Sequence, residues 1–183
     1  MDKIDDIERA LRRAAETLPS RPLPQLGAPA SAAGLLDVAY ATLDSPVGKL
    51  LLASTPRGLV RIAYLDEAGD DAVLTELAAR ISPRVLAAPH KLDEPRRELD
   101  EYFAGLRHRF ELGLDWRLTQ GFGRRVLKAT ARIPYGGVSS YKQVATEAGS
   151  PRGHRAAGNA LGSNPLPIIV PCHRVLHSDG GLW

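Results

Sequence analysis

Apolar residues change their spacing along the chain, and this change predicts where helices and strands lie. Ile4, Ile7, Leu11 and Ala14 recur at intervals of three or four, which predicts a helix that stops at Pro19. Residues 19–34 then hold four prolines, two glycines and several alanines, a composition that favours an extended linker. We therefore expect residues 1–35 to be an appended helix and a Pro/Ala-rich linker, which we interpret as a tether or a partner contact.

The next part of the chain, residues 36–117, has the pattern of a small α+β domain. Three short apolar runs are separated by turn sequences at Ser45-Pro46-Val47-Gly48 and Pro56-Arg57-Gly58, which predicts an antiparallel meander. Helical spacing follows, with brief extended segments between the helices. The predicted strands cover residues 38–42, 49–54, 59–65, 85–87 and 110–114, and the predicted helices cover 72–81 and 93–104.

Residues 118–183 read as helical up to an apolar segment, 166–170, that we expect to be a strand. The predicted helices cover 120–133, 141–148 and 153–161. The second and third are joined by the turn Gly149-Ser150-Pro151, which is typical of a helix-turn-helix, a motif whose second helix enters a DNA groove. An ordinary helical hairpin has the same pattern and is more common. The small residues and the single arginine in the last helix favour the DNA-binding interpretation.

Composition and charge narrow the class of protein. The chain of 183 residues is 44% hydrophobic and 25% charged, as in globular proteins. No apolar run approaches the roughly 18 residues of a membrane span, and the first sixteen residues lack the pattern of a signal peptide. We expect no membrane contact and a cytoplasmic location.

Charge is distributed unevenly between the two parts of the chain. Residues 1–120 contain 16 Lys and Arg against 19 Asp and Glu, whereas residues 121–183 contain 8 against 2. A basic segment is typical of nucleic-acid binding, although an ordinary solvated face can carry the same excess.

Cys172 is the only cysteine, so the chain cannot form an internal disulfide or a four-cysteine metal site. A lone cysteine is most often a small, inert core residue. Here Pro171 ends the apolar run before it, and His173 and Arg174 follow, which are residue types that favour a thiolate. The chemistry indicated is that of a nucleophilic sulfur. His90 and His108 have no cysteine or second histidine at ligand spacing, so we expect no metal site.

Several ordered motifs around Cys172 carry a family resemblance. Together they closely resemble the O6-alkylguanine-DNA alkyltransferases, also called methylated-DNA–protein-cysteine methyltransferases. The resemblance implies an α+β fold, with a ribonuclease-H-like sheet domain over 36–117 and a winged helix-turn-helix-like catalytic domain over 118–183. The motifs are Asp44-Ser45-Pro46-Val47-Gly48, Ser140-Tyr141-Lys142-Gln143-Val144-Ala145, Arg155-Ala156-Ala157-Gly158, Asn164-Pro165-Leu166-Pro167-Ile168 and Pro171-Cys172-His173-Arg174-Val175.

The same resemblance implies three catalytic residues. Cys172 would accept the alkyl group in an in-line displacement and stay alkylated, so that each molecule acts once. His173 would act as the base through a bridging water. Asn164 would order the active-site turn by hydrogen bonding.

The partner implied is double-stranded DNA containing O6-alkylguanine or O4-alkylthymine, bound by a monomer without a cofactor. The damaged nucleotide must be flipped out of the duplex to be reached. Arg155 would fill the vacated stack and Tyr141 would press on the neighbouring phosphate. Ala156 and Gly158 would face the minor groove, and Arg174 completes the DNA-binding set.

The family pattern normally continues beyond Gly180 with a loop that covers the base and a helix that carries a glutamate, whereas this chain ends at Trp183. We therefore expect a chain truncated at its C-terminus. His154 also replaces a small residue that the family places before the arginine. Two alternatives stay open: a lesion sensor that binds without catalysis, against which Cys172 argues, and an inactive truncated homologue. The absence of a four-cysteine site argues against a third option, a transcriptional regulator with a fused metal-dependent sensor domain.

Overall fold

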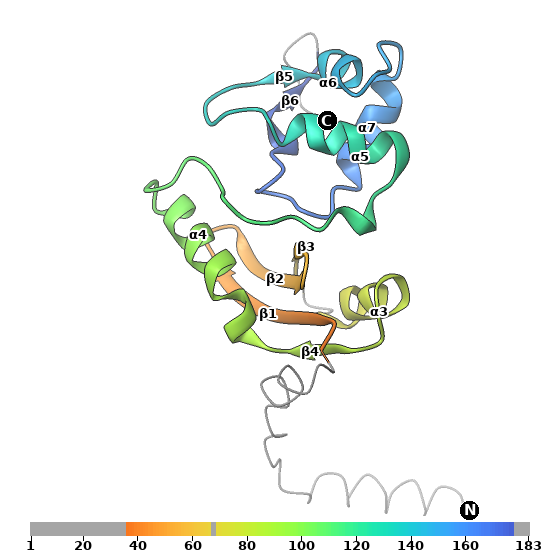
Figure 1. Ribbon diagram of the computed structural model, residues 1–183. Helices are drawn as coiled ribbons and strands as arrows, with labels where there is room; N and C mark the ends of the chain where they lie inside the picture. The colour runs from red at the N-terminus through yellow and green to blue at the C-terminus, as the bar shows by residue number, and fades with distance from the viewer. Residues whose placement is uncertain (1–35, 67–68, 178–183) are drawn as a thin grey trace, which may run out of the picture.

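A computed structural model describes residues 36–66 and 69–177. A four-stranded sheet with two helices forms one half of the molecule, and three helices and a short two-stranded sheet form the other (Figure 1). The predicted helix and linker over residues 1–35 lie outside the described residues. The α+β architecture expected from the sequence is confirmed.

The first three strands form the predicted antiparallel meander. β1 (Val38–Ser45), β2 (Gly48–Thr55) and β3 (Gly58–Tyr64) pair in sequence, and the short β4 (Val85–Ala87) joins β1 in parallel. The order β3-β2-β1-β4 makes β3 an edge strand. α3 (Asp71–Arg80) precedes β4, and the single turn η1 (Pro89–Leu92) leads from it into α4 (Asp93–Phe103).

The strand predicted over residues 110–114 is wrong, because a side chain, not a neighbouring strand, forms a hydrogen bond with the backbone at Glu111. The buried carboxylate of Glu98 accepts a hydrogen bond from the Glu111 N–H at 2.9 Å. Only one isolated bridge, between Leu59 and Leu114, links this part of the described chain to the sheet, and the Leu59 N–H donates to the Gly113 carbonyl at 2.8 Å. Gly58 permits this crossing: its φ is +122°, and an added Cβ would lie 2.2 Å from the Gly113 carbonyl oxygen.

The second half begins after the turn η2 (Trp116–Leu118). It contains α5 (Gly121–Thr130), α6 (Tyr141–Glu147) and α7 (His154–Gly162), followed by η3 (Cys172–Arg174). Two very short strands, β5 (Ser139–Ser140) and β6 (Val175–Leu176), pair in parallel and join the start of α6 to the end of η3. The three predicted helices are therefore confirmed within a few residues.

The strand predicted over residues 166–170 is also wrong: the segment is a compact turn. The Val170 N–H donates to the Leu166 carbonyl at 2.9 Å, and Ile168 has a φ of +73°. Pro165 and Pro167 lack N–H groups, so the segment cannot form a full strand ladder. Most of its side chains are nevertheless buried in the core. Burial of successive residues explains why this part of the sequence is continuously apolar.

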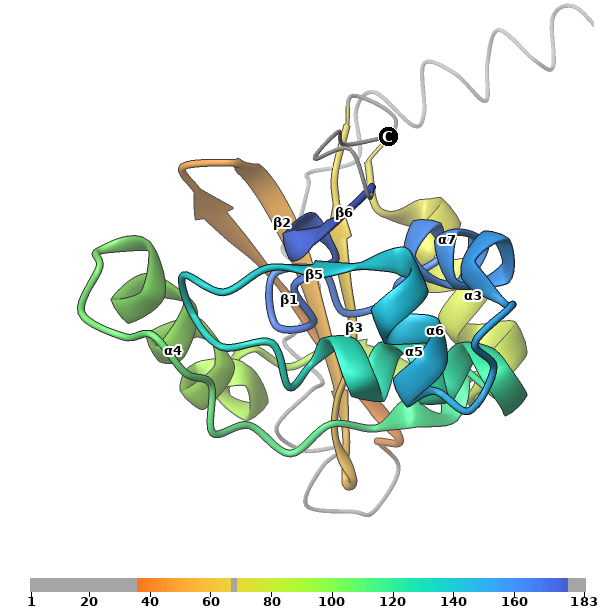
Figure 2. The same cartoon turned by 90° about the horizontal axis from the view of Figure 1, so that it is seen from above.

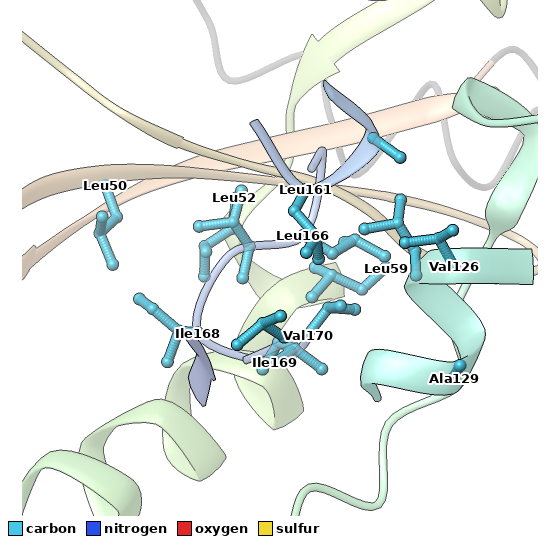
Figure 3. Packing of buried hydrophobic residues seen from close by; sticks show 14 of the residues in the cluster. Leu50, Leu52, Leu59, Val126, Ala129, Leu161, Leu166, Ile168, Ile169 and Val170 are labelled. Carbon is cyan, nitrogen blue, oxygen red and sulfur yellow. The ribbon is translucent and has the colours of Figure 1, made fainter. Parts of the chain in front are cut away.

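The two halves of the described chain share one hydrophobic core. One face of the sheet contributes Leu50, Leu52, Leu59 and Ile62, and these residues cluster with Val126 of α5 and with the turn before Cys172 (Figure 3). α4 borders the same face, whereas α3 covers the opposite one, and Figure 2 shows these two helices on opposite sides of the sheet. α5, α6 and α7 lie above the sheet in Figure 1. The residues of the turn in this shared core are Leu166, Ile168, Ile169 and Val170.

A backbone hydrogen bond reinforces this packing. The Ile62 N–H of the edge strand β3 donates to the Pro165 carbonyl at 2.8 Å. The sheet therefore supports the turn that leads to Cys172 through apolar packing and a backbone hydrogen bond.

Candidate functional site

Cys172 is the first residue of η3 and is partly accessible. Its N–H donates to the Val170 carbonyl at 2.8 Å, and the Arg174 N–H donates to the Pro171 carbonyl at 2.9 Å. These bonds bend the chain sharply at the point where the buried turn ends. The backbone is therefore fixed while the thiol lies at the border between core and surface.

The Asn164 side chain joins the two ends of the turn before Cys172. Its Oδ1 accepts from the Leu166 N–H at 3.0 Å, and its Nδ2 donates to the Val170 carbonyl at 2.9 Å. Asn164 is buried, with 9% of its surface exposed. The Val170 carbonyl thus receives both the Asn164 amide and the Cys172 N–H, which ties the position of the cysteine directly to this side chain.

His173 follows the cysteine within the same turn of 3-10 helix. The residue as a whole is exposed, but burial around the imidazole, helped by the positive charge of Arg174, lowers the pKa of His173 below its usual 6.5. The ring is therefore uncharged at neutral pH. An uncharged imidazole can accept a proton, so it has the protonation state that a general base requires.

Arg174 is directed into the protein. Its guanidinium donates to the Ile133 carbonyl and to the Tyr102 hydroxyl, both at 3.3 Å, and lies 5.3 Å from the centre of the Tyr135 ring. Tyr102 belongs to α4, so Arg174 links the segment after Cys172 to the sheet half. These contacts place its charge beside the cysteine turn instead of on the outer face of α7.

Tyr141 lies at the start of α6, close to the cysteine. Ser140 caps this helix, because its Oγ accepts from the Gln143 N–H at 3.1 Å. The Tyr141 ring lies 5.0 Å from that of His177. Partial burial raises the pKa of Tyr141, and the negative charge of Cys172 adds to this effect.

The remaining predicted DNA-binding residues lie on α7. Arg155 and Ala156 are exposed in its first turn and Gly158 is half-buried, whereas Ala157 and Ala160 pack into the core. α6 and α7 pack against each other and against α5. The structure therefore presents Arg155 and its small neighbours on one outer face of a helical pair.

Tyr64 is a residue of this region that the motifs did not reveal. It ends β3, is 55% exposed, and has a raised pKa because of partial burial and the charge of Cys172. No signal in the sequence links the end of a strand at residue 64 to a cysteine more than a hundred residues later.

A cavity of about 740 Å³ lies next to the cysteine turn but does not include the thiol. It is lined by residues such as Tyr102, Tyr135, Ile168 and Arg174. Cys172 is not part of this lining, although its neighbours Pro171 and Arg174 are.

Two further properties concern the described residues only. Residues 36–66 and 69–177 contain no group of three or more His, Cys, Asp or Glu side chains arranged to hold a metal ion. In the same ranges, every helix is too short or too polar to cross a membrane.

Comparisons with known proteins agree with this geometry. Residues 38–116 match the ribonuclease-like domain, and residues 121–183 the DNA-binding domain, of 6-O-methylguanine DNA methyltransferase. A methylated-DNA–protein-cysteine methyltransferase of Methanosarcina barkeri is 37% identical over 143 residues, which cover 78% of this chain and 85% of that protein.

Two solved structures from Mycobacterium tuberculosis are also similar. The O6-methylguanine methyltransferase is 36% identical with a TM-score of 0.67, and covers 80% of this chain and 82% of its own. The OGT in complex with DNA is 36% identical with a TM-score of 0.64, and covers 78% of this chain and 81% of its own.

Proposed function

Since this chain belongs to the 6-O-methylguanine DNA methyltransferase family, we propose that Cys172 is the residue that accepts the alkyl group. The function is DNA repair by alkyl transfer, and DNA is the partner. The observation that carries our assignment is the placement of the only cysteine: a partly accessible thiol on a backbone fixed by Asn164, directly before an uncharged histidine.

The proposed reaction is one nucleophilic displacement. The thiolate of Cys172 forms a bond to the alkyl carbon while the bond from that carbon to guanine O6 breaks. The electron pair of the broken bond stays on the guanine, which takes up a proton, and the protein keeps a thioether. His173 removes the thiol proton through a bridging water, as its uncharged state allows. A thioether does not hydrolyse under mild conditions, so each molecule reacts once.

We assign two residues to positioning. Asn164 fixes the Val170 carbonyl, to which the Cys172 N–H is bound, and so holds the sulfur in one place. Arg174 keeps the following segment against α4 through Tyr102. Reactions of this kind lose rate when the attacking atom is misplaced by even about 1 Å.

The proposed DNA interface is the outer face of α6 and α7. The protein, as a monomer, would bind the minor groove of a duplex that contains O6-alkylguanine or O4-alkylthymine and flip the damaged nucleotide towards Cys172. Exposed Arg155 fills the space left in the stack, Ala156 and Gly158 allow close approach, and Tyr141 meets the neighbouring phosphate. In this proposal, residues 118–183 bind the DNA and carry the reacting cysteine, and residues 36–117 support that domain.

The test is intact-protein mass spectrometry after incubation with an oligonucleotide that contains O6-methylguanine. We expect one methyl increment on the wild-type protein and none on Cys172→Ala. Preferential binding of the damaged oligonucleotide without any increment would instead identify a lesion sensor. A methyl increment that persists in Cys172→Ala would refute the assignment of the acceptor.

A further inference from the structure

Tyr64 is a large aromatic residue left exposed at the end of an edge strand. It is the last residue of β3 and pairs with Leu50 of β2. More than half of its surface is exposed, although the neighbouring positions of the sheet are buried. Tyrosine is enriched at binding interfaces because its ring is apolar and its hydroxyl polar, which makes Tyr64 a candidate contact for a ligand.

The direction of the Tyr64 side chain follows from the alternation of the strand. Successive residues of a strand point to opposite faces, so Tyr64 lies on the same face as Ile62. Ile62 is buried in the core shared with the cysteine turn, whereas the intervening Ala63 faces the cluster around α3. Tyr64 therefore continues the face of the sheet on which the cysteine turn rests.

The edge strand is fixed to that turn close to Tyr64. The hydrogen bond from the Ile62 N–H to the Pro165 carbonyl, 2.8 Å long, lies two residues before the tyrosine. Asn164, which comes directly before Pro165, holds the turn to the carbonyl that the Cys172 N–H binds. Tyr64 and Cys172 therefore lie on segments that hydrogen bonds join directly, although they belong to different halves of the chain.

Electrostatics agrees with this placement. The charge of Cys172 contributes to the raised pKa of two tyrosines, Tyr64 from the sheet and Tyr141 from α6. Charges affect one another in this way only when they are close. Aromatic rings from both halves of the molecule therefore lie near the thiol.

We propose that Tyr64 is a specificity-determining residue, whose ring contacts the part of an O6-substituent that extends beyond the carbon attacked by Cys172. This inference rests on the proposed function. A methyl group consists of the attacked carbon alone and ends at the sulfur. A benzyl group carries an aromatic ring beyond that carbon, and this ring needs a surface near the sulfur against which to pack. Tyr64 offers such a surface from the sheet side.

The test compares two substrates in single-turnover kinetics: oligonucleotides that contain O6-methylguanine or O6-benzylguanine. We expect Tyr64→Ala to lower the second-order rate constant for benzyl transfer by about tenfold, the lower range for loss of one aromatic stacking contact. Methyl transfer should stay within about twofold of wild type, as for other surface substitutions. Tyr64→Phe keeps the ring and should resemble wild type with both substrates.

Val47→Ala serves as the matched control, because Val47 is also exposed, at 50%, and lies in the β1–β2 turn of the same sheet. It should change neither rate. An equal loss with both substrates, no loss with either, or faster benzyl transfer in Tyr64→Ala would each overturn the proposal. The methyl reaction of the wild-type protein tests the proposed function separately, since its absence would refute that function before any variant is compared.

A spectroscopic measurement gives a second, independent readout. Alkylation of Cys172 removes its negative charge, so the pKa of Tyr64 should fall when the wild-type protein has reacted. Ultraviolet titration of the tyrosines before and after methylation would detect this fall. The fall in tyrosine pKa on methylation should be smaller in Tyr64→Phe, in which only Tyr141 responds. An equal fall in wild type and in Tyr64→Phe would place Tyr64 away from the thiol.

Discussion

Removal of the Asn164 side chain tests how the cysteine turn is held. Asn164→Ala deletes two buried hydrogen bonds, one from the Leu166 N–H and one to the Val170 carbonyl. The two losses differ in size. The Val170 carbonyl still accepts from the Cys172 N–H, so its loss costs about 0.5–1.5 kcal/mol. The buried Leu166 N–H loses its acceptor, which costs about 1–3 kcal/mol.

We therefore expect Asn164→Ala to lower the free energy of unfolding by about 1.5–4.5 kcal/mol. For a chain of this length, the melting temperature should fall by roughly 3–18 °C. Urea denaturation and calorimetry measure both quantities. Ser163→Ala is the neighbouring control: Ser163 is exposed and bonds only within α7 and its end, so its loss should cost less than about 0.5 kcal/mol.

Asn164→Asp sharpens the test because its effect depends on pH. A carboxylate can still accept from the Leu166 N–H, but its second oxygen faces the Val170 carbonyl in place of a donor. Repulsion and burial should raise the pKa of this carboxyl in the folded protein above its value in the unfolded chain. The protonated form restores the missing donor, so the stabilisation is present at low pH and lost as pH rises through the folded pKa.

The stability of Asn164→Asp should therefore approach that of wild type near pH 4 and fall behind it towards pH 7, when both are measured at each pH. Alkyl transfer by both variants should be slower than wild type at pH 7, because residue 164 no longer donates to the Val170 carbonyl and so no longer fixes the group to which the Cys172 N–H is bound. Our explanation of the turn would be refuted if Asn164→Ala were as stable as Ser163→Ala, or if the deficit of Asn164→Asp did not change with pH.

Two further predictions concern the base and the fold. Because burial and Arg174 lower the pKa of His173, the fall in the rate of alkyl transfer on acidification should be centred below pH 6.5. A fall centred above that value in single-turnover assays would contradict the role of His173. Gly58→Ala should destabilise the protein more than Gly48→Ala in urea denaturation. Both residues have positive φ, which costs about 1–3 kcal/mol for alanine, but only the Cβ at Gly58 would meet a backbone oxygen, at 2.2 Å, and equal effects would show that this clash is relieved.

Local patterns predicted most of the secondary structure correctly. The strands of the meander alternate between two cores, with Leu51 on one face and Leu50 and Leu52 on the other, and turn residues separate them. The helices of the second half have clear apolar faces, such as that of Val126 and Leu127 on α5. Strand alternation and apolar helix faces are both visible within a few consecutive residues, and they depend little on contacts with distant parts of the chain.

The errors occurred where distant groups determine the conformation. Residues 110–114 read as a strand, but the Glu98 carboxylate takes one of their N–H groups. Residues 166–170 read as a strand because they are apolar, but Asn164 and two prolines make them a turn. The ordered motifs around Cys172 predicted the family, which the comparisons confirm, whereas Tyr64 belongs to no motif and lies near the thiol only through the fold.

The core shared by the two halves has a consequence for biosynthesis. A ribosome adds about 5–20 residues per second, so on the order of ten seconds pass between the completion of β3 and the arrival of the cysteine turn. During this interval the face of the sheet formed by Leu50, Leu52, Leu59 and Ile62 has nothing to cover it from the second half. The unpaired edge of β3 is exposed at the same time, and such edges pair readily with other chains. The nascent sheet should therefore be a chaperone substrate, and slow translation of the second half should lower the yield of folded protein.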